Sequence, residues 1–140
     1  MRQAADILSV QTRGRGLHEI TAEIRRWTER QALGTGLLTI FCRHTSASLL
    51  IQENAAREVR SDLEAYFEAI APEAPGRYAH DDEGPDDMPA HIRTALTGVQ
   101  LSIPIIGGTP ALGTWQGVYL FEHRRQPHRR EVALHLLGET

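Results

Sequence analysis

The chain has 140 residues, with fifteen basic side chains against eighteen acidic ones and a formal net charge of −3. Every basic residue is an arginine, which excludes enzymes that need a catalytic lysine, such as Schiff-base enzymes and Walker-type nucleotide hydrolases. The single cysteine, Cys42, cannot form an internal disulfide or a multi-cysteine metal site, and this suits a reducing compartment. The near-neutral charge, without a basic run, argues against a nucleic-acid-binding protein.

The length predicts a single domain over residues 1–140. No apolar stretch typical of a signal peptide follows the N-terminus. The longest apolar runs, Gly36–Cys42 and Ser48–Ile51, are far shorter than the ~20 residues that a membrane helix needs. We therefore expect no membrane partner.

The first half of the chain predicts two buried strands after a strand and a helix. A strand near Ile7–Gln11 precedes a helix that Thr21 can cap and that Gly34–Gly36 ends. Leu37–Arg43 is apolar on both faces, as in a strand buried between two layers, and Ser48–Gln52 is a second strand. One face of this helix, at helical spacing, carries Ile20, Ile24, Trp27 and Gln31.

A second helix is predicted after Asn54, which is a plausible cap, and it ends before Pro72. Its amphipathic pattern is the clearest in the chain and consists of Val59, Leu63, Tyr66, Phe67 and Ile70. An acidic loop over residues 71–89 follows, and a loop of this length is typically functional or disordered.

The remaining elements are a third helix and three strands. The helix carries Met88, Ile92, Ala95 and Leu96 and stops at Gly98. The strands are expected over Val99–Ile105, Trp115–His123 and Glu131–Leu137. The order of elements and the short connections predict an α+β fold with about three helices and a mostly antiparallel sheet or sandwich.

Three segments concentrate reactive side chains. The first is His44-Thr45-Ser46-Ala47-Ser48, which places an imidazole and three hydroxyls at the end of a buried strand. By itself this segment favours the simpler interpretation of a polar turn, in which these side chains bond to local backbone.

The second segment, His80 to His91, holds five carboxylates and two histidines in twelve residues. Like charges this close repel one another, and a divalent cation such as Mg²⁺ or Zn²⁺ would relieve the repulsion. A structural alternative assigns Asp86 or Asp87 to capping the helix that opens at Pro89. Capping accounts for one aspartate only, so the segment favours a functional role.

The third segment runs from Gly113 to Arg124. As a strand it places Trp115, Tyr119 and His123 on one face, a pattern that a hydrophobic core also produces. Gln116 offers a donor and an acceptor beside a large aromatic ring, which suits a planar heterocycle or an anionic group. The terminal Glu122-His123-Arg124 is equally compatible with an exposed ion pair.

Taken together, the segments place four histidines on loops and strand ends, with carboxylates between them. Three or four imidazoles around one metal, with a position open for substrate, are a common catalytic arrangement. The sequence therefore predicts a metal site formed by His44, His80, His91 and His123.

In this order and at these separations, the three segments and Glu53-Asn54 closely resemble the YjbQ family, also called UPF0047 or the secondary thiamine-phosphate synthase family. The resemblance runs from about Ile7 to Glu139. It implies a compact cytoplasmic α/β protein that assembles as a homotrimer. It also implies a metal near the motif histidines and a weak thiamine-phosphate synthase activity, in which a pyrimidine pyrophosphate alkylates a thiazole phosphate and pyrophosphate leaves.

On this basis we expect a metal-dependent enzyme that acts on a small phosphorylated metabolite with a Zn or Mg ion. Asp86 and Asp87, with Asp81 and Glu83, would orient the histidines or hold a second ion. Trp115 and Gln116 would position the substrate ring, Arg124 would contact its phosphate and Glu53 would act as general base. Two alternatives are a non-catalytic trimeric protein that binds a metal or metabolite, and a structural trimer joined by the polar cluster.

Two departures from the family pattern bear on this expectation. Gln52 stands where many members have asparagine. Thr109-Pro110 occupies a turn in which members commonly carry Gly-Arg. The missing arginine weakens any phosphate contact made from that turn.

Overall fold

The computed structural model describes residues 1–140 and contains eight strands and three helices. Their bounds in chain order are β1 Arg2–Gln11, β2 Gly16–Glu19, α1 Thr21–Arg30, β3 Thr35–Cys42, β4 Ala47–Glu53, α2 Arg57–Ile70, α3 Asp87–Thr97, β5 Gln100–Ile106, β6 Thr109–Pro110, β7 Gln116–Glu122 and β8 Arg129–Glu139.

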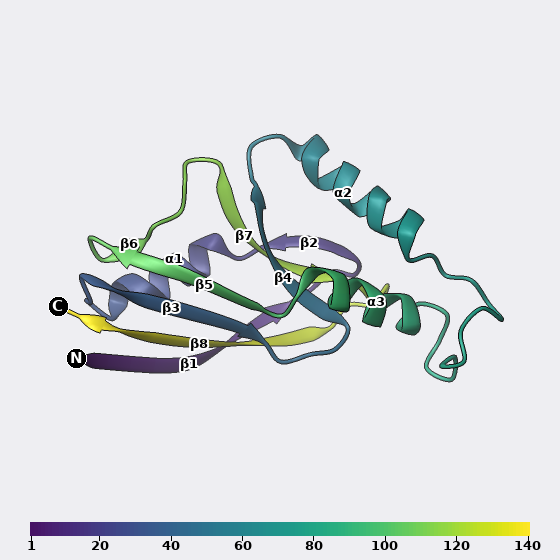
Figure 1. Cartoon of the computed structure of the whole chain (residues 1–140), viewed down its shortest axis with the longest axis horizontal. Coiled ribbons are helices and arrows are strands. Elements are labelled where there is room, and N and C mark those ends of the chain that lie inside the picture. The colour runs from purple at the N-terminus through teal and green to yellow at the C-terminus, as the bar shows by residue number, and fades with distance from the viewer.

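The strands form two sheets, and every pair of neighbours is antiparallel. One sheet has the order β1-β8-β3-β5-β6, and the other has the order β2-β7-β4. Figure 1 shows the long strands β1, β8, β3 and β5 running side by side, with both chain termini at the same end. The predicted α+β fold with three helices and mostly antiparallel strands is therefore confirmed.

The core lies between the inner face of the larger sheet, the smaller sheet and α1. Alternate residues of β3 point inward, and Leu38 and Ile40 are fully buried. Helix α1 contributes Ile24 and Trp27 from its amphipathic face, as its spacing predicted. These residues belong to a single cluster of sixteen buried apolar side chains.

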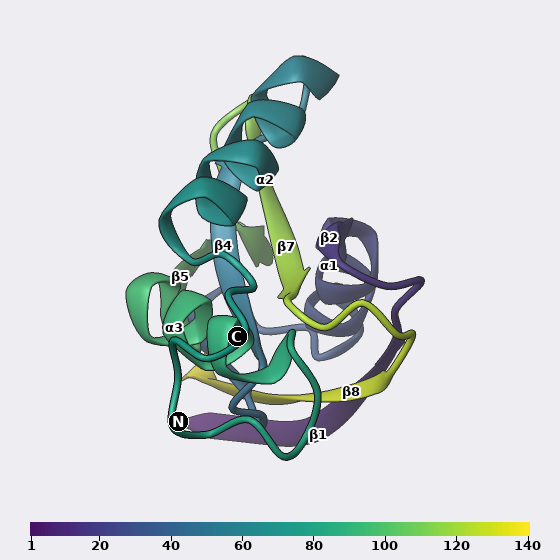
Figure 2. The ribbon, with the colours of Figure 1, turned by 90° about the vertical axis from the view of Figure 1, so that its right-hand side faces the viewer.

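The outer side of the smaller sheet carries the other two helices. Helix α3 packs on β4, whereas α2, at the top of Figure 2, contacts β2 and reaches β7 through Phe67 on Phe121 and Arg60 on Tyr119. Because both faces of β7 are covered, six of its seven residues are buried. In contrast, α2 has no buried residue in the single chain, although it is clearly amphipathic.

Some local predictions were wrong in instructive ways. Thr21 does not cap α1, because its hydroxyl accepts the N–H of Val118 and donates to Glu19. Asn54 does not cap α2, which begins three residues later. Gly98 does end α3, with a φ of 108° that favours glycine. No helix is both long enough and apolar enough to cross a membrane.

Candidate metal centre

The beginning of α3 brings one carboxylate and two imidazoles together. Asp87 and His91 are four residues apart and therefore project from the same face of the helix. Oδ2 of Asp87 lies 2.8 Å from Nε2 of His80, which comes from the preceding loop, and 3.1 Å from Nε2 of His91. One ligand atom from each residue lies within 4.8 Å of the other two, which is close enough to share an ion.

The hydrogen bonds of His91 limit its protonation state. Nδ1 lies 2.8 Å from the carbonyl oxygen of Thr45, which can only accept, so Nδ1 carries a proton. Nε2 faces Asp87, whose ionised carboxylate also can only accept. His91 must therefore either be an imidazolium or share a cation with Asp87 through the lone pair on Nε2.

Asp87 is the electrostatic centre of this group. Its side chain is only 4% exposed. Burial by itself raises the pKa of this carboxyl, but contacts with His80, His91 and Arg124 outweigh it and hold the pKa below the usual value. The hydrogen bond that His80 donates to Asp87, with the charges of Asp82, Asp87 and Glu83, raises the pKa of His80. Asp87 is therefore an ionised carboxylate at neutral pH.

Arg124 holds the two aspartates in place. Nη1 donates to Oδ1 of Asp87 at 2.8 Å, and Nε donates to Oδ2 of Asp86 at 3.1 Å. Nη2 donates to the carbonyl of Glu83 and to Asp86. Asp86 also accepts the backbone N–H of Arg125, and its side chain does not cap α3. Arg124 thus orients the carboxylates and is not a free cation for a phosphate.

A second group of ligand atoms overlaps the first. His80 lies near Asp82 and Glu83, with 3.1 Å between its Nε2 and Oε2 of Glu83. All three side chains are exposed to solvent. Because water screens such charges, the buried Asp87 makes the first group the stronger candidate for an ion.

His44 lies near this centre but does not contribute a ligand atom to it. Its Nε2 accepts the N–H of Glu131 at 2.7 Å. Burial and the charge of Arg130 lower the pKa of His44, so the ring is neutral. His44 and His91 both line a groove of about 600 Å³ along β3 and α3, with Phe41, Cys42, Arg43, Thr45, Thr94, Ala95 and Val99.

His123 is a buried residue outside both groups of ligand atoms. Its Nε2 lies 2.8 Å from the hydroxyl of Ser48, and its ring packs against Phe121. Burial, with the charge of Arg93, lowers the pKa of His123 to about 3. The prediction that four histidines share one metal is therefore corrected. His80 and His91 come together with Asp87, whereas hydrogen bonds hold His44 and His123 elsewhere.

Three further predicted residues lie at the opposite end of the smaller sheet. Glu53 pairs with Gln116, whereas Ala47 pairs with Glu122 at the end beside His123. Six residues of strand separate the two ends, which corresponds to roughly 20 Å. Oε2 of Glu53 accepts the N–H of Ala56, Gln116 accepts the N–H of Gly113, and Trp115 is exposed. Within one chain these residues do not join the metal centre.

Sequence reasoning missed the buried ion pair that supports the motif strand. Glu122 and Arg130 are both almost fully buried, and Nε of Arg130 lies 2.9 Å from Oε1 of Glu122. Thr12 donates to the same carboxylate. Burial raises the pKa of Glu122, but the bonds from Arg130 and Thr12 reverse this and lower it. The Glu122-His123-Arg124 segment thus begins with a core ion pair and not with an exposed one.

Comparison with known proteins agrees with this fold. The model of the family described as UPF0047 protein YjbQ-like matches residues 6–139. A UPF0047 protein of Synechocystis sp. is 51% identical over 139 residues, which cover 99% of this chain and 95% of that protein. YjbQ of Escherichia coli O157:H7 is 40% identical over 133 residues, covering 94% and 96% of the two chains.

Solved structures give the same result. A YjbQ/UPF0047 protein from Clostridium acetobutylicum has a TM-score of 0.86 at 31% identity, over 94% of this chain and 99% of that one. The conserved hypothetical protein TT1486 from Thermus thermophilus has a TM-score of 0.81 at 36% identity, with the same coverage. The matched length and these identities show that the chain belongs to the UPF0047 (YjbQ-like) family.

Proposed function

We propose that this protein is a metal-dependent enzyme that acts on a small phosphorylated metabolite, with the ion held by His80, Asp87 and His91. One observation carries the proposal. His91 lies between two hydrogen-bond acceptors. Its Nδ1 donates to the carbonyl of Thr45, and its Nε2 faces the carboxylate of Asp87, which has no proton to donate. A bound cation satisfies both Nε2 and Asp87 while the ring stays neutral.

The set of donors fits zinc better than magnesium. Two imidazoles and one carboxylate resemble the three-ligand sets of catalytic zinc sites, which leave one position open. Magnesium prefers all-oxygen ligands and keeps several waters. Imidazole ligands also suit iron and nickel. The ligand set therefore favours zinc or another transition metal as the bound ion.

A bound ion of this class supplies charge stabilisation to a phosphate or pyrophosphate group. Neighbouring residues of the chain orient the side chains that would hold this ion. Thr45 fixes the orientation of the His91 ring, and Arg124 fixes the carboxylate of Asp87. The groove shared by His44 and His91 gives a substrate access along α3. Arg43 lies in this groove and is tied only by a half-exposed ion pair to Glu131, so it replaces Arg124 as the candidate phosphate contact.

The reaction that we propose to test first is thiamine-phosphate synthesis, because the motif segments resemble a family associated with it. This reaction releases pyrophosphate, a group that a divalent ion and an arginine both stabilise. The chain has no lysine, so stabilisation by charge and not a lysine nucleophile fits its composition.

We also propose that the protein is a cytoplasmic homotrimer. The outer face of the larger sheet exposes large apolar side chains on neighbouring strands, and the absence of buried residues on α2 leaves a second face uncovered. Exposed apolar patches of this kind are typical of subunit interfaces. The residues on the sheet are Ile7, Leu37, Phe41, Ile106 and Leu137.

Metal loading and turnover test the enzymatic proposal. The protein is stripped with chelator and titrated with Zn²⁺ in competition with a metal-binding dye, and pyrophosphate release from the two thiamine precursors is then measured with and without Zn²⁺. We expect stoichiometric binding and zinc-dependent turnover. Asp87→Asn and His91→Ala should each lose both.

His135→Ala provides the matched control, since this half-buried histidine lies outside both groups of ligand atoms and its side chain bonds only to Gln3. It should keep the binding and activity of the wild type. Zinc binding without turnover of these precursors would favour the metal- or metabolite-binding alternative. Full turnover by metal-free protein would falsify the metal-centred mechanism.

A further inference from the structure

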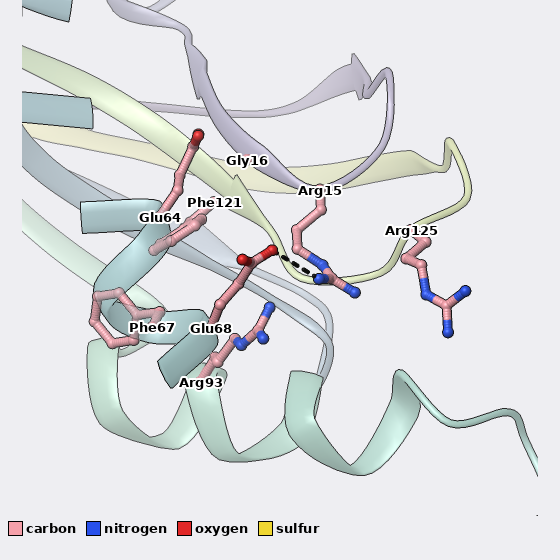
Figure 3. Close-up of a pocket in the computed structure, with 8 residues that line it drawn as sticks. All are labelled: Arg15, Gly16, Glu64, Phe67, Glu68, Arg93, Phe121 and Arg125. Carbon is pink, nitrogen blue, oxygen red and sulfur yellow. Dashed lines mark hydrogen bonds and ion pairs between the residues drawn. The ribbon is translucent and has the colours of Figure 1, made fainter. Parts of the chain in front are cut away.

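A separate pocket lies on the other side of α3, beneath α2. Its volume is about 230 Å³, and it is bounded by the β1–β2 loop, α2, α3, β7 and the loop that follows β7. Figure 3 shows Arg93 reaching up from α3 and Arg15 reaching in from the β1–β2 loop. The lining residues are Arg15, Gly16, Glu64, Phe67, Glu68, Arg93, Phe121 and Arg125.

The decisive feature of this pocket is the guanidinium of Arg93. The residue is only 2% exposed, yet its one hydrogen bond goes from Nη2 to the carbonyl of Ala71 at 2.9 Å. It forms no ion pair, and its Nε is buried without a partner. Glu68 and Glu73 act on Arg93 only from a distance, without a direct ion pair. A buried guanidinium without a directly bonded counter-charge is unfavourable, so this position is suited to an anion.

The other two arginines of the pocket already have acidic partners. Arg15 contacts Glu68 at 3.2 Å and Glu73 at 2.8 Å, and Arg125 also pairs with Glu73. Even so, Nε of Arg15 is buried without a partner, as is Nδ1 of His123. His123 follows the end of β7 and packs its ring against Phe121, but it does not line the pocket. Two buried arginine nitrogens without a partner, Nε of Arg15 and Nε of Arg93, therefore belong to residues that line this pocket.

We propose that this pocket binds a small oxyanion, either a phosphate group or a carboxylate, with Arg93 as its main partner and Arg15 beside it. Guanidinium groups bind both kinds of oxyanion through paired hydrogen bonds. Phe67 and Phe121 form an apolar wall that suits the carbon skeleton of an organic anion. The volume corresponds to roughly seven or eight water molecules and is sufficient for a small metabolite.

The acidic side chains of α2 predict which substitutions strengthen anion binding in this pocket and which weaken it. Glu68 lines the pocket and competes with an anion for Arg15, whereas Glu64 is occupied by the N–H of Leu17. An anion is therefore placed on the side of α3, away from the carboxylates. Removing the charge of Glu68 should strengthen binding, while removing that of Arg93 should weaken it.

This site is distinct from the metal centre. Arg93 lies two residues after His91, which turns it by about 200° around the helix axis to a different face of α3. Its test can therefore use metal-free protein, and failure here says nothing about zinc binding at His80, Asp87 and His91.

Isothermal titration of the chelator-treated protein with inorganic phosphate, and separately with acetate, at constant ionic strength tests the proposal. We expect saturable binding of at least one oxyanion, with the stronger ligand identifying the class. Arg93→Gln should weaken this binding at least tenfold, and Glu68→Gln should tighten it. Arg26→Gln removes an equal positive charge from the solvent-exposed side of α1 and should leave the affinity for the oxyanion unchanged.

Thermal unfolding provides a second readout, since bound oxyanion should raise the Tm of the wild type but not that of Arg93→Gln. If Arg93→Gln does not fold, Arg15→Gln replaces it with the same expected loss. The proposal is overturned if no oxyanion binds more tightly than about 10 mM. It is also overturned if Arg93→Gln, or its replacement Arg15→Gln, binds as tightly as the wild type.

Discussion

Nη1 of Arg124 donates a 2.8 Å hydrogen bond to Oδ1 of Asp87, and the other oxygen of this carboxylate faces two histidines. The guanidinium therefore fixes the rotation of a carboxylate that would otherwise turn freely at the first residue of α3. Such supporting bonds tune metal sites as strongly as some ligands do.

Arg124→Gln should accordingly weaken zinc binding by about 10- to 100-fold without abolishing it, because the ligands remain but lose their orientation. Competition with a chelating dye measures this change. Arg129→Gln is the control, since Arg129 contacts only Ser9 through an exposed bond. Equal zinc affinities in Arg124→Gln and the wild type would show that Asp87 does not depend on this contact.

The outer face of the larger sheet makes a prediction about assembly. Phe41→Glu places a charge among exposed apolar side chains and should convert trimers into monomers, as measured by sedimentation velocity. Glu131→Gln, which only removes a charge from the half-exposed pair with Arg43, should leave the trimer intact. A wild-type protein that sediments as a monomer would contradict the proposed assembly.

The buried pair of Glu122 and Arg130 predicts a large loss of stability. Glu122→Gln leaves the guanidinium without its counter-charge and should lower the free energy of unfolding by about 3–5 kcal/mol in urea. Glu131→Gln removes a carboxylate from the exposed pair with Arg43 and should cost no more than about 1 kcal/mol. If both variants lose less than about 1 kcal/mol, the buried pair of Glu122 and Arg130 adds little to the free energy of unfolding.

His123 predicts how stability depends on pH. Its folded-state pKa of about 3 lies below the ordinary 6.5, so the folded protein disfavours protonation of this ring. The stability that the neutral ring contributes is complete above pH 6.5 and is lost as the pH falls towards 3. At ~1.4 kcal/mol per pH unit, about 2 kcal/mol disappears between pH 6.5 and about pH 5.

Urea unfolding of the wild type and of His123→Gln at several pH values checks this dependence. Glutamine keeps a polar group near Ser48 but does not titrate, so the variant should show a flatter profile over this window. The other histidines are common to both proteins and cancel in the difference. Parallel profiles would show that His123 does not cause the acid sensitivity.

The sequence predicted most elements because their signals are local. The apolar spacing of α1 and the glycine after α3 act within a few residues, and both appear where they were expected. Strand β2 was missed because Gly16–Glu19 is short and gains its place by pairing with β7. The helix caps were wrong because the Thr21 hydroxyl bonds to Val118, about a hundred residues away in sequence.

In the candidate site, too, local features could be predicted from the sequence and long-range contacts could not. Asp87 and His91 could be paired from their spacing once the helix is known to begin at Asp87 and not at Pro89. The separation of His44 and His123 from this pair could not be predicted, because backbone of β8 binds one and Ser48 of β4 binds the other. The pocket of Arg15, Arg93 and Arg125 has no local signature at all.

Helix α2 has a consequence for the kinetics of ligand entry. Because none of its residues is buried, displacing it from the single chain exposes little apolar surface and costs far less than global unfolding. The same helix carries the side chains that cover the arginine pocket. In the single chain its amides should therefore exchange with solvent faster than those of α3, and local opening of α2 would set the rate at which the pocket fills and empties.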